Sequence, residues 1–272
     1  MITLSESKGT FQGLFGLLGH GIKYSLSPRI HNYIFSRYGI NAVYALFDLP
    51  PQDFHTAIQA LIRRTPGFNV TTPYKEECAE FLPVLSREAS MTGSVNLVKG
   101  NKGYNTDFLA LEELVRARGL DLSSKECTIF GSGGAARTAA YLFGNMNMYI
   151  TVVNRNLERA EKLQADLSRA SIDARAVTLK SSISTETLDS EVFVNCISYP
   201  EFRYPAMKTA LAVDFNYASR SGNFRTRIQG KHSIITGEEI LVSQAIHSQI
   251  IWNDISPDFS EIMEVINVEH TG

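Results

Sequence analysis

The sequence contains neither a long apolar run nor a leader segment. None of its apolar stretches approaches the roughly 20 residues that a membrane-spanning helix needs. The first residues, MITLSESKGTFQG, lack the basic start and apolar centre of a secretory signal peptide. We therefore expect a cytoplasmic protein that has no membrane partner.

Cysteine is scarce, and neither sign of charge is in excess. Cys78, Cys127 and Cys196 are odd in number and widely separated, which argues against a disulfide framework and matches no metal-ligand spacing. None of the six histidines belongs to a ligand-like cluster, so no metal is expected. The 26 basic residues nearly balance the 28 acidic ones. This balance predicts no nucleic acid partner and favours a small soluble ligand.

Predicted strands and helices alternate along the chain. The strand LFGLLG, a helix from Pro28, the strand NAVYALFDL, a helix from Pro51 and the strand GFNVT form a first series. A second series follows Asn105, with the strands CTIF, YITVVNR, EVFVNCI and ALAVDF, and is typical of a doubly wound parallel sheet. A last helix, ILVSQAIHSQIIW, follows Gly237. The 272 residues suit two domains of about 100 to 150 residues each.

A glycine-rich turn between a strand and a helix is the most specific local motif. It consists of Gly131, Ser132, Gly133, Gly134, Ala135 and Ala136. In a dinucleotide-binding turn, the first glycine allows the tight bend and the second lets the backbone approach a pyrophosphate. A plain structural turn is the alternative, but the flanking strand and helix favour a dinucleotide site.

The next strand is followed by residues that select between cofactors. It leads into Asn154 and Arg155, and Arg159 comes one helical turn later. An NAD site would carry an acidic residue here to bind the ribose hydroxyls. Arginine suits a 2′-phosphate instead, and the missing carboxylate removes a repulsion. We predict NADP, the alternative being a solvated helix start that carries two arginines.

Two serines precede the first predicted helix. Serine is favoured at the N-cap of a helix and proline at its first helical position. We therefore predict that Ser27 is the N-cap and that the helix starts at Pro28. Capping does not account for Ser25. Two hydroxyls beside free backbone amides are suited to binding a carboxylate.

Lys75 and Asp107 are the candidates for proton transfer. Thr72 and Pro73 predict a helix that would place Lys75 in its first turn, where the helix dipole disfavours a cation by about 0.3 to 1 kcal/mol. Such a lysine suits a group that gives and takes a proton. A surface lysine and a helix-capping aspartate are the alternative interpretations. Taken together, the two side chains form an ammonium–carboxylate pair.

The chain resembles the shikimate dehydrogenase family in an ordered series of motifs along nearly its whole length. They are Ser-x-Ser-Pro, Asn-Val-Thr-x-Pro-x-Lys, Gly-x-Val-Asn, Asn-Thr-Asp, Gly-x-Gly-Gly-Ala-x-Arg, Asn-Arg, the tetrapeptide DFNY at 214–217, and the stretch from Gly237 to Gln244-Ala245. The resemblance implies an α/β fold of two domains. The α/β substrate or catalytic domain would comprise residues 1–104 and 238–272, and the doubly wound Rossmann-type NADP domain residues 105–237, with the substrate in the cleft.

The resemblance also implies a reaction: reversible, NADP-dependent oxidation of shikimate to 3-dehydroshikimate, a step of aromatic amino acid biosynthesis. The substrate would be shikimate or a related carbocyclic hydroxy acid, and the protein a monomer or homodimer. Lys75 and Asp107 would be the catalytic pair. Substrate contacts would come from Ser25, Ser27, Asn69, Thr71, Asn96, Asp107, Tyr217 and Gln244. Gly237 would join the glycine-rich turn, Asn154, Arg155 and Arg159 in the cofactor site.

Four places depart from the usual family pattern. Tyr24 stands where His is common, Phe108 where Gly is common, Ile197 where Thr is usual, and Glu238-Glu239-Ile240 where a Gly-x-Met sequence often meets the nicotinamide. These changes add bulk or charge near the expected cleft and predict a shikimate-dehydrogenase-like paralogue. One alternative is a quinate or shikimate dehydrogenase of broader specificity, which would tend to tolerate NAD. Another is a non-catalytic ligand sensor, which would be expected to have lost the catalytic pair. Folate-linked methylene dehydrogenases share a similar layout, but the Asn-Thr-Asp and Ser-x-Ser-Pro segments favour a carbocyclic acid.

Overall fold

The chain forms two compact units in the computed structural model, which describes residues 10–178, 188–199, 201–217 and 222–267. The first unit comprises Met1–Thr106 and Leu241–Gly272, and the second comprises Asp107–Ile240. The polypeptide therefore leaves the first unit once and returns to it within a helix near the carboxyl end. The two-domain α/β fold predicted from the sequence is confirmed.

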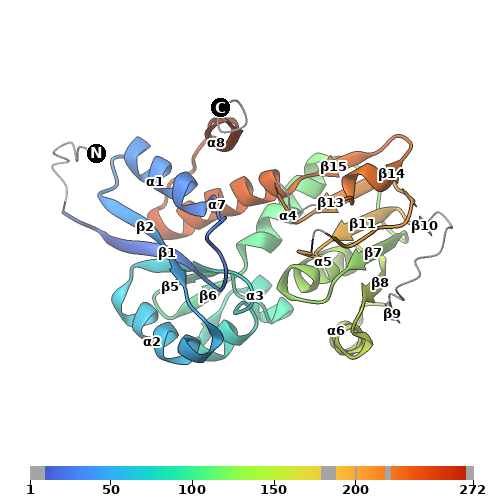
Figure 1. Cartoon of the computed structure of the whole chain (residues 1–272), viewed down its shortest axis with the longest axis horizontal. Helices are drawn as coiled ribbons and strands as arrows, with labels where there is room; N and C mark the ends of the chain where they lie inside the picture. Colours follow the sequence, from blue (N-terminus) through green and yellow to red (C-terminus); the bar gives the residue numbers. More distant parts are fainter. Residues whose placement is uncertain (1–9, 179–187, 200, 218–221, 268–272) are drawn as a thin grey trace. The chain divides into compact units, whose positions relative to one another are not determined.

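A mixed six-stranded sheet of order β2-β1-β3-β5-β6-β4 forms the centre of the first unit (Figure 1). Strand β1 runs parallel to β2 and β3, whereas β5 is antiparallel to β3 and β6. The strands are β1 (Gly13–Gly19), β2 (Ala42–Asp48), β3 (Gly67–Val70), β4 (Val84–Leu85), β5 (Leu97–Lys99) and β6 (Lys102–Tyr104). The helices are α1 (Ser27–Arg37), α2 (Phe54–Arg64), α3 (Arg87–Thr92), α7 (Gly237–Asn253) and α8 (Phe259–Asn267), with 3₁₀ turns at Pro51–Asp53 and Glu77–Phe81.

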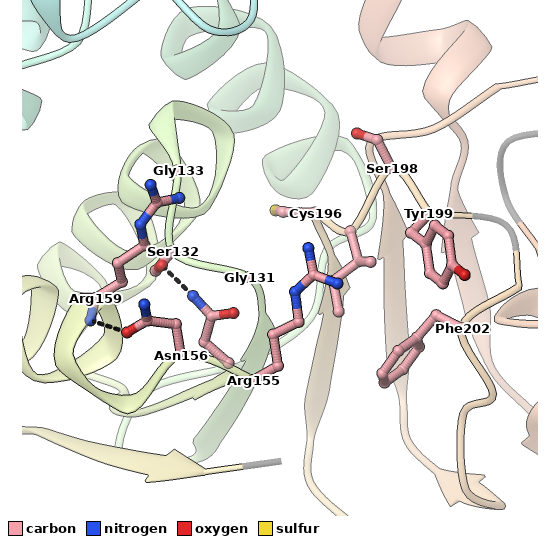
Figure 2. A pocket seen from close by; sticks show the side chains of 12 residues that line it. Gly131, Ser132, Gly133, Arg155, Asn156, Arg159, Cys196, Ser198, Tyr199 and Phe202 are labelled. Carbon is pink, nitrogen blue, oxygen red and sulfur yellow. Dashed lines mark hydrogen bonds between the residues drawn. The ribbon is translucent and has the colours of Figure 1, made fainter. Parts of the chain in front are cut away.

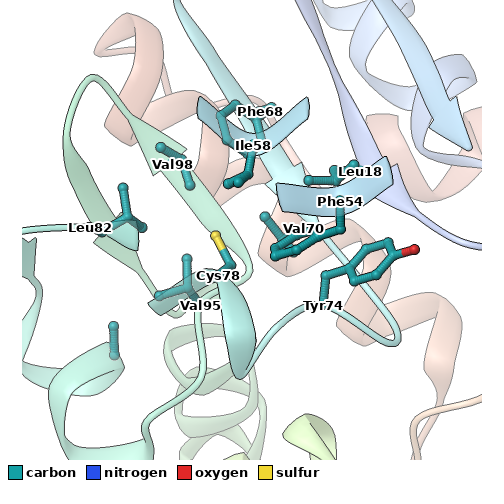
Figure 3. Packing of buried hydrophobic residues seen from close by; sticks show 11 residues of the cluster. Leu18, Phe54, Ile58, Phe68, Val70, Tyr74, Cys78, Leu82, Val95 and Val98 are labelled. Atoms are coloured by element: carbon teal, nitrogen blue, oxygen red, sulfur yellow. The ribbon is translucent and has the colours of Figure 1, made fainter. Parts of the chain in front are cut away.

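Side chains of β1 alternate between two apolar cores, as the period of two in a strand requires. Leu18 packs with Phe54, Ile58 and other residues of the cluster in Figure 3. Phe15 and Leu17 enter a separate cluster that also contains Trp252 of α7. Because both faces of the strand are buried, β1 reads as a nearly continuous apolar run in the sequence.

The second unit contains a fully parallel six-stranded sheet of order β15-β13-β11-β7-β8-β9, as predicted. Its strands are β7 (Glu126–Phe130), β8 (Tyr149–Asn154), β9 (Ala174–Thr178), β11 (Val192–Asn195), β13 (Leu211–Asp214) and β15 (Ser233–Ile235). Its helices are α4 (Thr106–Ala117), α5 (Gly134–Asn145) and α6 (Leu157–Arg169), with a 3₁₀ turn at Arg225–Arg227. A small parallel sheet contains β10 (Leu188–Asp189), β12 (Met207–Lys208) and β14 (Ile228–Gln229).

The predicted N-cap of α1 was wrong. Helix α1 begins at Ser27, because Leu26 already has a right-handed helical backbone conformation. The amide of Ser27 donates to the hydroxyl of Ser25 at 3.2 Å. Ser25 therefore satisfies one of the free amides at the start of α1, although no side chain caps the helix at its N-cap position.

The predicted α-helix around Lys75 was also wrong. Residues 72–76 form turns that lead into the 3₁₀ segment Glu77–Phe81, so the helix-dipole argument for Lys75 does not apply. The cause is Tyr74, whose ring is buried and stacks on Phe54 at 4.4 Å between ring centroids. Its hydroxyl points out of the apolar cluster in Figure 3 and donates to the carbonyl of Leu49 at 2.6 Å. This anchoring takes precedence over the local helix signal of Thr72-Pro73.

Helix α7 begins with a reciprocal capping box. The amide of Thr236 donates to the Glu239 carboxylate at 2.8 Å, and the amide of Glu239 donates to the Thr236 hydroxyl at 3.2 Å. Glu239 therefore has a structural role at the position where the sequence departs from the family pattern. Across residues 10–178, 188–199, 201–217 and 222–267, no helix is long and apolar enough to cross a membrane.

His31 of α1 is the only fully buried histidine among the described residues. Its ring stacks on Tyr44 at 4.3 Å between centroids, and its Nδ1 lies 2.8 Å from Nε2 of Gln249. Burial lowers the pKa of His31 from 6.5 to about 3. The folded protein therefore keeps this imidazole neutral at pH values where an unfolded chain protonates it.

We predict that His31 makes the folded state less stable as the pH falls below about 6.5. The unfolded chain binds a proton at His31 in that range and the folded chain does not until about pH 3, so stability is lost between these values at up to about 1.4 kcal/mol per pH unit. Urea unfolding of His31→Gln between pH 7 and pH 4.5 should show a shallower slope than the parent protein. Equal slopes for His31→Gln and the parent protein would contradict the prediction.

Candidate functional site

The strand order of the second unit creates a ligand-binding position between β7 and β11. From β7 the chain proceeds to β8 and β9 on one side, and then to β11, β13 and β15 on the other. The loops that follow β7 and β11 consequently lead away in opposite directions at the carboxyl end of the sheet. In open parallel sheets, such a topological switch point is where ligands bind.

A cavity of about 550 Å³ lies at this switch point (Figure 2). Its walls come from the residues that follow β7, β8 and β11, and none of the lining residues is acidic. They are Gly131, Ser132, Gly133, Asn154, Arg155, Asn156, Arg159, Cys196, Ile197, Ser198, Tyr199 and Phe202. A basic, partly aromatic cavity of this kind suits an anionic ligand that carries a ring.

The glycine-rich turn leaves room beside its backbone. Gly131 has a φ of 116°, a conformation that residues with a side chain rarely adopt. A Cβ built on Gly133 would meet no atom within 4 Å, so open space lies where a ligand would approach the backbone. No side chain caps α5, and its first amides are therefore available for a phosphate.

Two arginines provide the positive charge of the cavity. Arg155 and Arg159 are exposed, and within the described residues neither guanidinium has an ion pair. Figure 2 shows both among the lining residues, with Tyr199 and Phe202 on the side away from Arg159. Asn156 caps α6 by accepting the amide of Arg159 at 3.1 Å, which fixes the start of the helix that carries this arginine.

The structure gathers most of the predicted cofactor residues and adds others. Gly131, Ser132, Gly133, Asn154, Arg155 and Arg159 line the cavity, whereas Gly134 and Ala135 lie in the first turn of α5 and Gly237 begins α7. The sequence reasoning missed Asn156, Cys196, Ser198, Tyr199 and Phe202. Except for Asn156, these residues follow β11. Ligands bind at the carboxyl ends of parallel strands, and applying this rule to β11 would have found them.

A buried polar network in the first unit contains three of the predicted substrate residues. The Asn69 amide donates to the carbonyl of Asn96 and to the hydroxyl of Ser248, both at 3.1 Å. The Ser248 hydroxyl in turn donates to the carbonyl of Gln244 at 2.8 Å. Tyr44 completes the surroundings of Asn69 by donating its hydroxyl to the side-chain oxygen at 2.8 Å. These bonds fix the orientation of Asn69.

The network determines which atoms remain available for a ligand. Both amide protons of Asn69 are used inside the protein, so its oxygen is the atom left to accept a further bond. Asn96 is the reverse case, because its oxygen accepts the amide of Thr106 at 2.7 Å and the hydroxyl of Thr106 at 3.1 Å. Its amide group therefore remains for donation.

The other predicted substrate residues lie at strand and helix ends. Ser25 and Ser27 precede and begin α1, with their hydroxyl oxygens 3.2 Å apart. Thr71 follows β3, where its amide donates to the carbonyl of Leu18 at 2.8 Å. In the second unit, Tyr217 is half-buried after β13.

Lys75 lies in the first unit, and Asp107 is the first residue of the second unit. The carbonyl of Lys75 accepts the amide of Val95 at 2.8 Å, and the next residue, Asn96, binds Thr106 through its side chain. Asp107 follows Thr106 in the first turn of α4 and is 7% exposed. Lys75 is half-buried.

Comparison with known proteins assigns the family. Residues 17–98 match the model of the shikimate dehydrogenase substrate binding domain. The shikimate dehydrogenase of Sulfurisphaera tokodaii is 36% identical over 93% of this chain and 94% of its own length. This chain belongs to the shikimate dehydrogenase family.

Two other members of the family have names that specify a cofactor. The shikimate dehydrogenase (NADP(+)) of Sulfolobus acidocaldarius is 37% identical over 93% of this chain and 94% of its own. The shikimate 5-dehydrogenase of Thermus thermophilus, solved in complex with NADP(H) and shikimate, has a TM-score of 0.75 and 26% identity, and covers 94% of this chain and 98% of its own. The likeness therefore extends over both units.

The departures from the shikimate dehydrogenase pattern find structural explanations. Glu239 pairs with Arg118 at 2.7 Å and Glu238 pairs with Arg225 at 3.1 Å, so both added charges are neutralised. Ile240 and Phe108 are buried, at 4% and 6% exposed, whereas Tyr24 is 48% exposed and Ile197 is half-buried at the cavity.

We predict that the protein binds NADP at least about tenfold more tightly than NAD, because a charge-assisted bond to the 2′-phosphate is worth at least the roughly 1.4 kcal/mol that tenfold requires. The double variant Arg155→Ala, Arg159→Ala should bind the two cofactors about equally. Titration of both cofactors by calorimetry measures the ratio. Lys162→Ala removes a positive charge from the same helix outside the cavity and should keep the preference; a double variant that still prefers NADP would place the phosphate elsewhere.

Proposed function

We propose that this protein is an NADP-dependent shikimate dehydrogenase that reversibly oxidises shikimate to 3-dehydroshikimate. The observation that carries the proposal is the cavity at the switch point, whose only charged lining residues among those described are Arg155 and Arg159. It lies in a chain that matches shikimate dehydrogenases over 93% of its length. The cavity fits a dinucleotide phosphate, and the family supplies the substrate class.

The cofactor would be held by two kinds of group. The free amides at the start of α5 would bind the pyrophosphate, and Arg155 and Arg159 would bind the 2′-phosphate. When bound, NADP supplies the hydride acceptor. The open space at Gly133 is consistent with this placement, because a side chain there would compete with the ligand.

Lys75 and Asp107 would handle the proton of the substrate hydroxyl. During oxidation this proton must leave as the carbonyl forms, and in the reverse direction it must return. An ammonium beside a carboxylate can hold the proton at either stage and can stabilise charge on the reacting oxygen. The family motifs Asn-Val-Thr-x-Pro-x-Lys and Asn-Thr-Asp, which contain Lys75 and Asp107, support this pairing.

The substrate would be oriented by contacts of complementary type. Ser25 and Ser27 would donate to its carboxylate. The Asn69 side-chain oxygen, which already accepts the Tyr44 hydroxyl, would use its second lone pair to accept a substrate hydroxyl, and the Asn96 side-chain amide would donate to a hydroxyl oxygen. Thr71, Tyr217 and Gln244 would complete the contacts with the ring. A polyhydroxylated acid satisfies both donors and acceptors of this set.

We further infer that the protein works in the cytoplasm, as a monomer or homodimer. None of its three cysteines, all of which lie in the described part of the chain, forms a disulfide bond, which is typical of a reducing compartment. Cys78 and Cys127 are buried, and burial raises the pKa of the Cys78 thiol to about 12. Thiols of this kind act as apolar packing groups rather than as reactive ones.

The proposal is tested by assaying the purified protein with NADP and NAD against shikimate, quinate and aminoshikimate. We expect reduction of NADP with shikimate as the preferred substrate. A preference for quinate with either cofactor would indicate the broader quinate or shikimate dehydrogenase. Binding of shikimate without reduction of either cofactor would indicate the ligand sensor and would overturn the proposal.

We predict that Ser25→Ala raises the KM for shikimate more than it lowers kcat, because a carboxylate contact is similar in the ground and transition states. The variant also removes the acceptor for the Ser27 amide and should cost about 1 kcal/mol of stability. Steady-state kinetics and thermal unfolding are measured together. As a control, Ser86→Ala removes the side-chain cap of α3, a hydroxyl that likewise accepts a backbone amide at a helix start. This variant should lower stability without changing the KM. An unchanged KM in folded Ser25→Ala would show that the carboxylate binds elsewhere.

We predict that Lys75→Ala and Asp107→Ala each lower kcat by about two to four orders of magnitude, the usual loss for a general acid or base. NADP affinity should change little. If the two act as one unit, the double variant should be little worse than the worse single one. Lys23→Ala and Glu112→Ala, at residues outside the proposed site, serve as controls for loss of charge. Near-normal turnover in folded, NADP-bound Lys75→Ala would refute the mechanism.

A further inference from the structure

A fully buried carboxylate lies at the carboxyl end of β13. Asp214 is 0% exposed, and a buried charge is costly unless it is both paired and hydrogen-bonded. One of its oxygens accepts the Asn195 side-chain amide at 2.9 Å and the Asn216 backbone amide at 3.1 Å. The other accepts Nε of Arg225 at 2.8 Å. Arg225 therefore supplies the charge that this position requires.

Arg225 reaches two further elements with the same guanidinium. Its Nη2 donates to the carbonyl of Asn216 at 3.1 Å and to the carboxylate of Glu238 at 3.1 Å. Glu238 lies in the first turn of α7, and the preceding Gly237 is pressed against the Asn216 loop, since a Cβ at Gly237 would lie 2.3 Å from the carbonyl oxygen of Asn216. The planar fork of one arginine thus joins the end of β13, the loop after it and the start of α7.

The same bonds extend to the wall of the cofactor cavity. Ile197, a lining residue, donates its amide to the Asn195 side chain at 3.0 Å, and its carbonyl accepts the Asn216 side-chain amide at 2.8 Å. Both asparagines are held by Asp214, which is held by Arg225. Tyr204 adds a further bond by donating its hydroxyl to Asn195.

We propose that Arg225 is a positioning residue of the reaction, which fixes the loop bearing Tyr217 relative to the Ile197 wall of the cofactor cavity. The inference rests on the proposed function, in which Tyr217 contacts the substrate and the cavity binds NADP. The loop after β13 and the loop after β11 have to keep a constant separation for substrate and cofactor to meet. Arg225 acts through Asp214 and Asn216, and it is not among the residues that line the cofactor cavity.

A second arginine of the same unit provides a matched control. Arg118 also donates to a glutamate in the first turn of α7, Glu239 at 2.7 Å, and to a backbone carbonyl, that of Ile234 at 2.9 Å. The two arginines are similarly exposed, 22% for Arg118 and 31% for Arg225. Only Arg225 binds the Asp214 network. If the only role of Arg225 were to hold the start of α7, substitution of Arg225 and substitution of Arg118 would change the kinetic constants and the NADPH affinity to the same extent.

The test compares Arg225→Gln and Arg225→Lys with Arg118→Gln in steady-state kinetics, NADPH binding by fluorescence titration, and thermal unfolding. Arg225→Gln should raise the Kd for NADPH and lower kcat/KM for shikimate by about tenfold each, the loss expected for one charge-assisted bond. Arg225→Lys keeps the positive charge but not the planar set of donors. It should therefore recover part of the lost NADPH affinity and part of the lost kcat/KM. Arg118→Gln should lower the melting temperature to a similar extent and leave both constants within about twofold.

Equal kinetic effects at Arg225 and Arg118, or unchanged constants in folded Arg225→Gln, would overturn the proposal. If Arg225→Gln does not fold, Glu238→Gln against Glu239→Gln repeats the comparison, because Asp214 keeps its arginine in both. There a larger loss of NADPH affinity at Glu238 supports the proposal, and equal losses contradict it. The NADPH titration needs no substrate, so a parent protein that binds NADPH without oxidising shikimate would refute the proposed function while leaving the effect of Arg225 on the cavity measurable.

Discussion

The strands of the six-stranded sheet in the second unit are all parallel, and three of them end on an asparagine or an aspartate. In a sheet covered on both faces, the strand interior must be apolar, and polar side chains are tolerated only where a strand ends and its neighbours can supply hydrogen bonds. Asn154, Asn195 and Asp214 are the last residues of β8, β11 and β13. Because parallel strands end at one edge, the side chains of these residues are placed together there, and each binds a loop that follows a strand.

The cavity is a consequence of that arrangement. Asn154 donates to Ser132 and so links the end of β8 to the glycine-rich turn after β7. Asn195 holds the amide of Ile197 in the wall on the other side of the switch point. One lining residue on each side of the switch point, Ser132 and Ile197, is therefore hydrogen-bonded to a strand end, which orients both walls of the cavity.

The fold was predictable where the pattern was long and repeated. The alternation of strands and helices gave the parallel sheet, and the glycine-rich turn with Asn154, Arg155 and Arg159 located one side of the cavity. The other side was missed because Cys196, Ser198 and Tyr199 carry no motif of their own. Only their position after a strand of the same sheet marks them, and the strand order is a property of the fold that spacing does not reveal.

The two errors at the helix starts had different causes, one local and one tertiary. Ser27 follows the rule for a capping residue, but Leu26 already has a helical backbone, and Ser25 becomes the acceptor. Thr72-Pro73 predicts a helix, but burial of Tyr74 against Phe54 holds the segment in turns. A cap is worth about 1 kcal/mol, whereas burying an aromatic ring is worth more. Local signals of that size are overridden when a neighbouring side chain belongs to the core.

The two glutamates at the start of α7 have a different effect in the structure from the one that the sequence indicates, because each has an arginine partner. The sequence indicates that Glu238 and Glu239 add negative charge at the position where the family resemblance implies contact with the nicotinamide. In the structure, each carboxylate is bound by its own arginine, and Glu239 also closes the capping box with Thr236. Their effect is therefore mechanical rather than electrostatic: they secure the first turn of α7. The charge that these two residues bring to the second unit is therefore balanced locally, by Arg118 and Arg225.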